Sequence, residues 1–163
     1  QKYLYKNLYS TMYAVAMRYS KDEDMATFIL NNSFLKVFTK IESHKPEHSF
    51  HGWVKRIVVN TALDELRKHK KHSNQLQIEE IQEPALSENV LDKLKAEDLL
   101  KAIQTLPGIT KAVFNLYTIE GYKHHEIAKK ISIPEGTSKW HVSQGRKLLK
   151  KKLANYLTET KRG

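Results

Sequence analysis

The sequence predicts an all-α protein made of two small helical domains joined by a flexible acidic linker. The chain has 163 residues, which is enough for two such domains. Apolar residues recur every three or four positions over most of it, and Gly and Pro, at 6 and 4, are scarce. Residues 1–72 carry 13 Lys and Arg against 7 Asp and Glu, residues 73–97 carry 2 against 6, and residues 98–163 carry 13 against 5. We therefore expect domains at 1–72 and 87–163, with the linker at 73–86.

Two helices are expected to open the first domain. Residues 3–19 have helical periodicity, with Leu4, Leu8, Met12, Val15, Ala16 and Tyr19 facing inward. Ser20 and Glu23 match a capping box, which would open a second helix over residues 22–42. Lys45-Pro46 ends that pattern, because proline disfavours helical geometry in the residue before it. The inward positions of the second helix are expected to be Met25, Phe28, Ile29, Leu35, Phe38 and Ile41.

A third helix is expected after Ser49, which can cap it. Its buried stripe would be Phe50, Trp53, Val54, Ile57, Val58, Ala62 and Leu66, and Trp53 is expected to pack there rather than stack on a base. Its outward positions are Lys55, Arg56, Asn60, Asp64, Arg67 and Lys68. Arg and Lys bind phosphate, and Asn and Asp can bond to base edges. Taken alone, however, such a charged face is more often only a solvated surface.

Four further helices are expected in the second domain. Ser87 can cap the first, whose inward residues would be Leu91, Leu94, Leu99 and Ile103. After the Leu106-Pro107-Gly108 break, Thr110 is expected to cap a short helix that carries Val113, Phe114 and Tyr117. Gly121 would close that helix, since glycine tolerates a left-handed conformation. The next short helix carries Ile127, Ala128 and Ile131, and a turn at residues 132–134 leads to a last helix at about 135–157 with Val142, Leu149 and Leu153 inward.

The segment at 121–149 predicts a helix-turn-helix, in which a short helix and a tight turn present a longer helix to the major groove. The outer face of the longer helix would carry Lys139, Trp140, Ser143, Gln144 and Lys147. Gln can bond an adenine edge bidentately, Lys can reach guanine or phosphate, and Ser can bond either. The alternative is a plain helical hairpin with a solvated charged face, which fits the whole pattern less well.

Composition narrows the classes of function. The net charge of +10 and the pI of about 9.6 favour a polyanionic partner, either nucleic acid or an anionic membrane surface. Two basic blocks separated by an acidic connector favour two DNA-contacting modules over a single membrane-binding helix. No apolar run approaches the roughly 20 residues that span a membrane. The absence of cysteine excludes disulfides and thiolate metal sites, and it is consistent with the cytoplasm.

The eight histidines invite a metal interpretation, especially His44, His48 and His51, and the adjacent pair His124-His125. None has the carboxylate spacing of a known metal motif, so we expect no metal and no cofactor, with the histidines facing solvent or phosphate. No phosphate-binding glycine loop, nucleophile motif or carboxylate pair is present either. The sequence therefore predicts a protein that is not an enzyme.

Taken together, these motifs resemble the extracytoplasmic-function sigma factors of the main bacterial sigma superfamily. In the first domain the resemblance is carried by Arg18-Tyr19 and by residues 34–38 and 49–68. In the second domain it is carried by Leu106-Pro107, Phe114, Glu120-Gly121-Tyr122, Glu126-Ile127-Ala128, Gly136-Thr137 and Arg146. The motifs follow the family's order over nearly the whole chain, and the acidic linker falls where the family has its connector.

The resemblance implies a role for each domain. Residues 1–72 would be region two, which recognises and melts the minus-ten element through the loop at 43–51 and through Lys55, Arg56, Asn60, Asp64, Arg67 and Lys68. The second helix would bind the clamp of the largest polymerase subunit through Asn31, Phe34, Leu35 and Lys36. Residues 87–163 would be region four, which binds the flap of the second-largest subunit. It would recognise the minus-thirty-five element through Lys123, Lys139, Trp140, Ser143, Gln144 and Lys147.

Three positions depart from the family pattern. Phe28 stands where the family has an acidic residue, and Asn31 stands where it has Gln. Lys123 replaces a capping Ser, and its ammonium cannot accept a backbone hydrogen bond, so this helix start should be weaker by about 1 kcal/mol. Lys123 is instead expected to reach a phosphate.

The sequence thus predicts a sigma factor that directs core RNA polymerase to specific promoters. An inhibitory anti-sigma partner is compatible with this function. The alternatives are a stand-alone helix-turn-helix regulator that binds duplex DNA without polymerase, and a histidine-dependent metal nuclease. The pattern from Trp53 to Lys68 argues against the first alternative.

Overall fold

The computed structural model describes residues 2–72 and 96–160, and it describes side chains over 2–68 and 98–154. Every regular element within these ranges is helical, as predicted. The chain divides into two units, residues 1–73 and 74–163, each described here by itself. The expected linker at 73–86, the Ser87 cap and the inward positions Leu91 and Leu94 lie outside the described residues.

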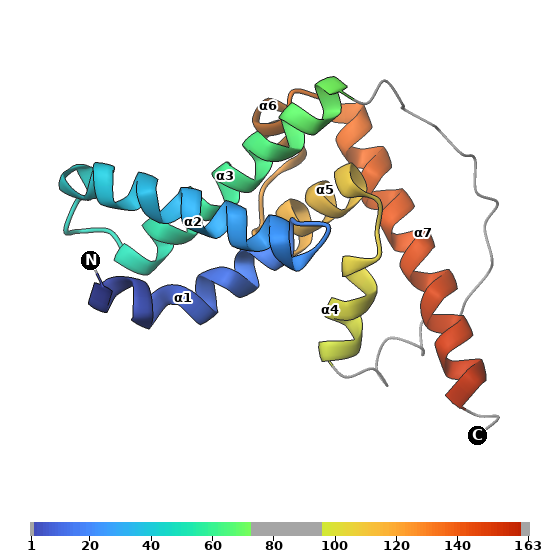
Figure 1. Cartoon of the computed structure of the whole chain (residues 1–163). Helices are drawn as coiled ribbons and strands as arrows, with labels where there is room; N and C mark the ends of the chain where they lie inside the picture. The colour runs from blue at the N-terminus through green and yellow to red at the C-terminus, as the bar shows by residue number, and fades with distance from the viewer. Residues whose placement is uncertain (1, 73–95, 161–163) are drawn as a thin grey trace. The chain divides into compact units, whose positions relative to one another are not determined.

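The first unit packs three helices against one another: α1 (Lys2–Met17), α2 (Glu23–Lys40) and α3 (Phe50–His72) (Figure 1). A short 3-10 turn, η1 (Ile41–Ser43), follows α2. The core is apolar and draws on all three helices: Met12, Val15, Ala16, Tyr19, Ala26, Ile29, Leu30, Phe34, Val37, Val54, Val58, Val59, Ala62 and Leu63. Leu4 and Leu8 are half-buried at the edge of this core.

The capping box expected at Ser20 is wrong. Asp22 is the N-cap of α2, and its Oδ1 accepts from the Met25 backbone N at 2.8 Å. Ser20 is buried, and its hydroxyl donates to the Met17 carbonyl at 3.3 Å, at the end of α1. Ser and Asp are both residue types that favour the N-cap position. Because the Ser20 hydroxyl bonds to the end of α1, Asp22 is the residue that caps α2.

The inward face predicted for α2 is also partly wrong. Phe28, Leu35 and Ile41 are exposed, at 50%, 64% and 42%. The face that packs lies about one residue further round and consists of Ala26, Ile29, Leu30, Ser33, Phe34 and Val37. Because α2 packs against both α1 and α3, small residues such as Ala26 and Ser33 let the neighbouring helices approach closely. Ser33 is accommodated there because its hydroxyl donates to the Ile29 carbonyl at 2.6 Å.

The start of α3 agrees with prediction. Ser49 Oγ accepts from the Gly52 backbone N at 3.2 Å, which confirms its role as the cap. Of the predicted stripe, Val54, Val58 and Ala62 are fully buried. Phe50, Trp53, Ile57 and Leu66 are half-buried, and Val59, Thr61 and Leu63 are additional core residues that the stripe did not include.

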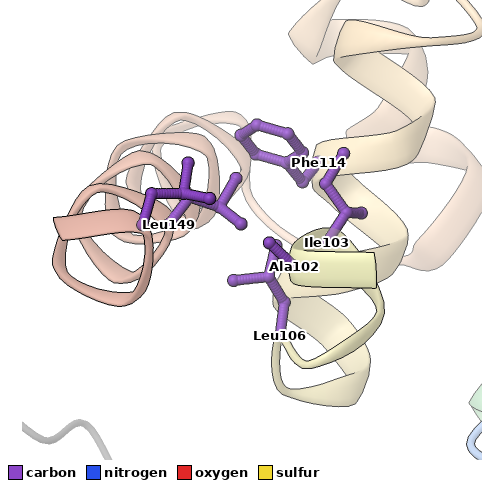
Figure 2. Close-up of a cluster of buried hydrophobic side chains, with 6 residues drawn as sticks. Ala102, Ile103, Leu106, Phe114 and Leu149 are labelled. Carbon is purple, nitrogen blue, oxygen red and sulfur yellow. The ribbon is translucent and has the colours of Figure 1, made fainter. Parts of the chain in front are cut away.

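The second unit contains α4 (Ala96–Gln104), α5 (Gly108–Thr118), α6 (His124–Ile131) and α7 (Glu135–Thr160). One part of its core lies where α4 and α5 pack on α7, and it consists of Ala102, Ile103, Leu106, Phe114, Leu149 and Leu153 (Figure 2). Gly145 of α7 lies so close to Phe114 that a Cβ on this glycine would be 2.6 Å from Phe114 Cδ2. Only glycine fits this helix crossing without displacing the ring.

The role expected for Thr110 is wrong. The N-cap of α5 is Pro107, so Thr110 lies inside the first turn, where it is buried. Pro107 has no backbone N–H to satisfy, which makes it a compatible start for a helix. At the other end, Gly121 adopts the left-handed conformation predicted for it, with φ +75°. The Tyr122 backbone N donates to the Leu116 carbonyl at 2.9 Å and closes the end of α5.

The predicted turn between α6 and α7 is confirmed. Ser132 adopts a left-handed conformation with φ 55°, and α7 begins three residues later. At the start of α6, the Lys123 side chain makes no capping bond, because an ammonium has no lone pair to offer. Glu126 compensates in part, since its Oε2 accepts from the Lys123 backbone N at 2.8 Å. Together α6, the turn and α7 form the helix-turn-helix.

Candidate nucleic-acid interface

The outer face of α3 carries the cationic residues that the sequence selected. Arg56, Asn60, Arg67 and Lys68 are exposed, and Lys55 and Asp64 are half-buried. All six lie on one helix, within 14 positions, so the helix alone brings them onto one side of the unit. This face is therefore mainly basic, with the Asp64 carboxylate near its centre.

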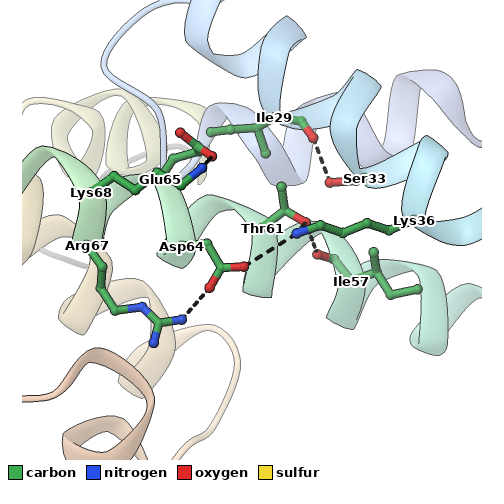
Figure 3. Close-up of polar contacts among 9 residues, drawn as sticks. All are labelled: Ile29, Ser33, Lys36, Ile57, Thr61, Asp64, Glu65, Arg67 and Lys68. Atoms are coloured by element: carbon green, nitrogen blue, oxygen red, sulfur yellow. Dashed lines mark hydrogen bonds and ion pairs between the residues drawn. The ribbon is translucent and has the colours of Figure 1, made fainter.

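That carboxylate, Asp64, organises the charges around it (Figure 3). Its Oδ2 accepts from Lys36 Nζ at 3.4 Å, and its Oδ1 forms an ion pair with Arg67. Lys36 Nζ also donates to Thr61 Oγ1 at 3.1 Å, and Thr61 in turn donates to the Ile57 carbonyl at 2.8 Å. The chain of contacts links α2 to α3. Asp64 therefore positions cations in this structure, in addition to whatever partner it offers a base.

The ion pairs on this face can be exchanged for other partners. The side chains of Lys36, Asp64 and Arg67 are each about 40% exposed, at 42%, 40% and 44%. Lys68 Nζ pairs with Glu65 Oε1 at 2.7 Å, and the lysine is mostly exposed. Partly exposed pairs such as Arg67–Asp64 contribute about 0–1 kcal/mol each. A phosphate can therefore displace the carboxylate from Arg67 at small cost.

The loop between α2 and α3 has an aromatic cluster at its base. The ring of His44 meets Phe50 edge-on at 5.1 Å and Trp53 at 5.3 Å, and the Phe50 and Trp53 rings are 5.7 Å apart. All three side chains are half-buried. His44 Nε2 also lies 3.1 Å from the His48 carbonyl, which bridges the loop. Trp53 thus packs as predicted, yet it keeps part of its ring accessible beside a loop of exposed residues.

Of the four α2 residues predicted to bind the polymerase clamp, three lie at the surface and one is buried beneath them. Asn31 and Leu35 are exposed and Lys36 is half-buried, whereas Phe34 is only 2% exposed. The Phe34 ring packs against Tyr5 at 4.7 Å and Phe38 at 6.0 Å. Phe34 therefore supports this surface from within and does not present its ring to a partner.

A tyrosine of the neighbouring helix also contributes to this surface. Tyr5 of α1 donates from its hydroxyl to Asn31 Oδ1 at 3.3 Å, which fixes the amide from the neighbouring helix. Tyr5, Tyr9 and Tyr13 follow one another along α1 with ring contacts at 5.3 and 5.8 Å. Their spacing of four residues was visible in the sequence, but only the packed structure shows which residue of α2 they meet.

The outer face of α7 presents the second set of candidate residues. Lys139, Trp140 and Ser143 are exposed, with Trp140 at 37%, and Gln144 and Lys147 are half-buried. Lys139 Nζ pairs with Glu135 Oε1 at 3.0 Å across one helical turn. The hydrogen bond and charge of Lys139 lower the pKa of Glu135, which holds it as a carboxylate. Lys123, at the start of α6, is exposed on the same unit.

Two histidines of this unit do not face solvent as expected. His141 is buried in α7, with Nδ1 2.9 Å from Thr110 Oγ1 of α5. His124 is half-buried at the start of α6, where its ring stacks on Tyr117 at 4.4 Å and its Nδ1 lies 3.0 Å from Ser138 Oγ of α7. A hydroxyl partner for each imidazole, and the Tyr117 ring beside His124, allow these two side chains to lie away from solvent. Burial is the main cause that lowers the pKa of His124, followed by the charge of Lys139.

Within 2–72 and 96–160, no group of three or more His, Cys, Asp or Glu side chains is arranged to hold a metal ion. No helix in the same part of the chain is both long enough and apolar enough to cross a membrane.

Known protein families match both units. The family described as Sigma-70 region 2 matches residues 4–72, and the family described as Sigma-70, region 4 matches residues 96–149. The two matches lie on the two units and together cover most of the chain.

Individual relatives agree. The RNA polymerase sigma factor SigV of Bacillus subtilis is 31% identical over 138 residues, which cover 85% of this chain and 81% of that protein. The ECF RNA polymerase sigma factor SigE of Mycolicibacterium smegmatis is 27% identical over 154 residues, which cover 91% of this chain but only 60% of that protein. The chain therefore spans about three fifths of the length of that relative.

A solved structure shares the fold. The sigma factor RpoE from Bartonella quintana, determined in complex with the anti-sigma factor NepR, superposes with a TM-score of 0.53. The alignment covers 94% of this chain and 96% of that chain, at 21% sequence identity.

Proposed function

This chain belongs to the sigma-70 family, as an RNA polymerase sigma factor of the extracytoplasmic-function type, and we propose that it directs core RNA polymerase to promoters with two separated recognition elements. The observation that carries the proposal is the pairing of each family region with its own basic helix face. The region 2 unit has the face on α3, and the region 4 unit has the face on α7. Members of this family are transcription initiation factors and not enzymes.

The first unit would recognise and help to melt the minus-ten element. Arg56, Arg67 and Lys68 would bind phosphates, since all three are exposed and the pair of Arg67 with Asp64 is weak. Lys55 and Asn60 would contribute from the same face, and Asp64 would orient Arg67 toward the DNA. The loop at 43–51, with the partly accessible ring of Trp53 beneath it, would accept bases of the separated strand. We assign this role to residues 1–72.

The second unit would recognise the minus-thirty-five element through the helix-turn-helix. The first turns of α7 would enter the major groove, where Gln144 and Ser143 would bond base edges and Trp140 would contact a thymine methyl or the backbone. Lys139, Lys147 and Lys123 would bind phosphate. We assign this role to residues 87–163, and residues 73–86 would tether the two units so that both elements are bound together.

Polymerase would bind both units. The exposed residues Asn31 and Leu35, with Lys36 beside them and Phe34 as their support, would contact the clamp of the largest subunit. The region 4 unit would bind the flap of the second-largest subunit. We also propose a cytoplasmic location and control by an anti-sigma partner. The solved complex of RpoE with the anti-sigma factor NepR supports the second proposal by analogy.

Run-off transcription with purified core RNA polymerase tests this function. Transcripts from a pool of genomic promoter fragments should appear only when the protein is added. Gln144→Ala and Arg67→Ala should reduce them, while Lys152→Ala, an exposed lysine further along α7, should change them little. No transcripts and no polymerase binding, together with tight binding to duplex DNA alone, would instead establish a stand-alone regulator.

A second measurement separates phosphate contacts from base recognition. Polymerase bound to the Lys139→Ala variant of this protein should bind all promoters more weakly. Its affinity should also depend less steeply on salt, because the loss of one phosphate contact lowers the slope of log affinity against log salt concentration by about 1. Gln144→Ala should change the preferred base at one position of the minus-thirty-five element. An unchanged base preference for Gln144→Ala, together with an unchanged salt dependence for Lys139→Ala, would contradict the role proposed for the outer face of α7.

A further inference from the structure

The inner face of α7 changes character along the helix. Ser138 and His141, near its start, are buried polar residues three positions apart on one side. Further along the same side, Gly145, Leu149 and Leu153 make the apolar contacts with α4 and α5. The polar part lies directly behind the proposed base-contacting residues, which occupy 139–147.

Each of the two buried polar residues is bonded to a different neighbouring helix. Ser138 Oγ lies 3.0 Å from His124 Nδ1 of α6, and that imidazole ring is itself held against Tyr117 of α5. His141 Nδ1 lies 2.9 Å from Thr110 Oγ1 of α5. Ser138, His141 and Thr110 are all at most 5% exposed, so water does not offer them an easy substitute. The start of α7 is therefore tied by hydrogen bonds to both helices that support it.

Hydrogen bonds constrain rotation more tightly than apolar contacts do. An apolar helix face can slide or turn by some degrees against its neighbours and still exclude water, as tolerant core repacking shows. A hydrogen bond weakens steeply once its angle falls below about 120°. Rotation of α7 about its own axis would break both bonds, and the atoms that they join are buried or half-buried. The contacts of Leu149 and Leu153 further along the helix break no hydrogen bond when the helix turns.

We propose that the pairs Ser138–His124 and His141–Thr110 set the rotation of α7 and so decide which of its side chains face a base edge. The four residues are positioning residues, because they lie behind the DNA-facing surface. One residue along a helix corresponds to about 100° of rotation, so a turn of a fraction of that angle moves Gln144 away from a bidentate geometry. This inference rests on the proposed function of α7 as the recognition helix.

The absence of cysteine makes the rotation measurable without polymerase or DNA. Single substitutions to cysteine at Lys139, Trp140, Val142, Ser143, Gln144 and Lys147 report the exposed side of α7 through their rates of thiol labelling. In the native background the rates should be slow for Val142→Cys and fast for Ser143→Cys, since Val142 is buried and Ser143 is exposed. The set of rates shows which side of α7 faces solvent, and we call this side the labelling phase of the helix.

Two double variants then replace each polar pair by apolar groups of similar size. Thr110→Val with His141→Leu removes one pair, and Ser138→Ala with His124→Phe removes the other while keeping a ring to stack on Tyr117. Replacing both partners avoids a buried polar group without a partner, so folding should be retained. Should one double variant fail to fold, the other still decides the question. Leu153→Ala is the control, because it weakens the same helix packing without touching either pair.

We expect the labelling phase of α7 to shift in the double variants and to stay native in Leu153→Ala. In run-off transcription with core polymerase, the same double variants should lose discrimination at the minus-thirty-five element. The roughly 5- to 150-fold preference that one bidentate base contact provides should fall toward equality, while the minus-ten preference stays unchanged.

Three results would overturn or delimit the proposal. A native labelling phase in folded double variants would overturn it, whatever the transcription assay shows. A shifted phase with native minus-thirty-five preference would overturn the link to base recognition. If the unsubstituted protein starts no transcription at all, the proposed function fails, and the labelling phase still decides whether the two polar pairs set the rotation.

Discussion

The two units hold their basic helices in different ways. On α3 the cations are tied down on the surface, where Asp64 binds Lys36 and Arg67 and Glu65 binds Lys68. On α7 the helix is fixed from beneath, through the buried pairs of Ser138 and His141. Partly exposed surface pairs can be exchanged for phosphates at small cost, which suits the binding of separated strands proposed for the α3 face. Buried pairs fix geometry, which suits the base recognition proposed for α7.

The difference extends to the interfaces that carry each helix. The α2–α3 contact combines an apolar core with the partly exposed bonds of Lys36. The α5–α7 contact depends on a glycine at the point of closest approach, with the Phe114 ring against Gly145. The second unit should therefore be the less tolerant of added volume. Five predictions test this comparison, from the largest expected effect to the smallest.

Gly145→Ala should destabilise the second unit by about 1–3 kcal/mol, because the new Cβ would overlap the Phe114 ring. Gly136→Ala is the matched control on the same helix, since no atom lies within 4 Å of its added Cβ. It should be neutral or stabilising by up to about 1 kcal/mol through helix propensity. Each unit has one tryptophan, so urea unfolding can follow Trp140 in a Trp53→Phe background. Equal stability of the two variants would contradict the close contact.

The start of α2 has a side-chain cap and the start of α6 lacks one, so removing the first cap and adding the second should change stability in opposite directions. Asp22→Ala should lower the stability of the first unit by about 1 kcal/mol, because it removes the acceptor for the Met25 N–H. Ser20→Ala should cost less, because Ser20 does not cap α2. Unfolding followed by Trp53 in a Trp140→Phe background measures both. A larger loss for Ser20→Ala would restore the capping box that the sequence suggested.

Lys123→Ser should raise the stability of the second unit by about 0.5–1 kcal/mol. Serine supplies the acceptor that lysine lacks, and Glu126 already provides the other half of the capping box. The gain should appear in the transition reported by Trp140 and be absent from that reported by Trp53. No gain would mean that the first turn of α6 is already satisfied by other means.

The surface network of the first unit should have only a small energetic coupling. A double-mutant cycle of Lys36→Met and Asp64→Asn should give about 0.2–1 kcal/mol, since both side chains are about 40% exposed. The coupling should shrink in 1 M salt, where screening extends over about 3 Å. A coupling of several kcal/mol that resisted salt would show that the pair is effectively buried, and it would remove the contrast with α7.

Mild acid should weaken the second unit. The pKa of His124 is lowered by burial and then by Lys139, so the unfolded chain binds its proton first as the pH falls. The stability that neutral His124 contributes is present above about pH 6.5 and is lost as the pH falls through the folded-state pKa. His124→Gln should remove this dependence, and His125→Gln should keep it, since His124 is intact. Unfolding at pH 5 to 8, reported by Trp140, is the measurement.

Most elements of the fold followed from periodicity, and the errors occurred where two local choices competed. Ser20 and Asp22 are both residue types that can cap α2. Thr110 can also cap a helix, but Pro107 is the N-cap of α5 and Thr110 lies inside its first turn. The inner face of α2 was misplaced because hydrophobicity selected Phe28 and Leu35. The neighbouring helices instead required small residues at the crossing, such as Ala26 and Ser33. Hydrophobicity ranks side chains, but close packing depends on their shape.

The candidate surfaces were predictable because a single helix presents each of them. The outward residues of α3 and α7 share a face through helical spacing alone, and that spacing is a property of the sequence. The contacts that organise these surfaces come from residues 14 to 31 positions away: Lys36 beneath Asp64, His124 beside Ser138 and Thr110 beside His141.

The sequence by itself determined the helices, the left-handed turn at Gly121, and the two basic faces, because each depends on residues within a few positions of one another. Only the tertiary structure decided which face of α2 is buried, why position 145 requires glycine, and which histidines are buried. Those outcomes depend on which helices meet and how closely. These outcomes are determined by distances between residues that are far apart in the sequence, and the local spacing of residue types does not specify those distances.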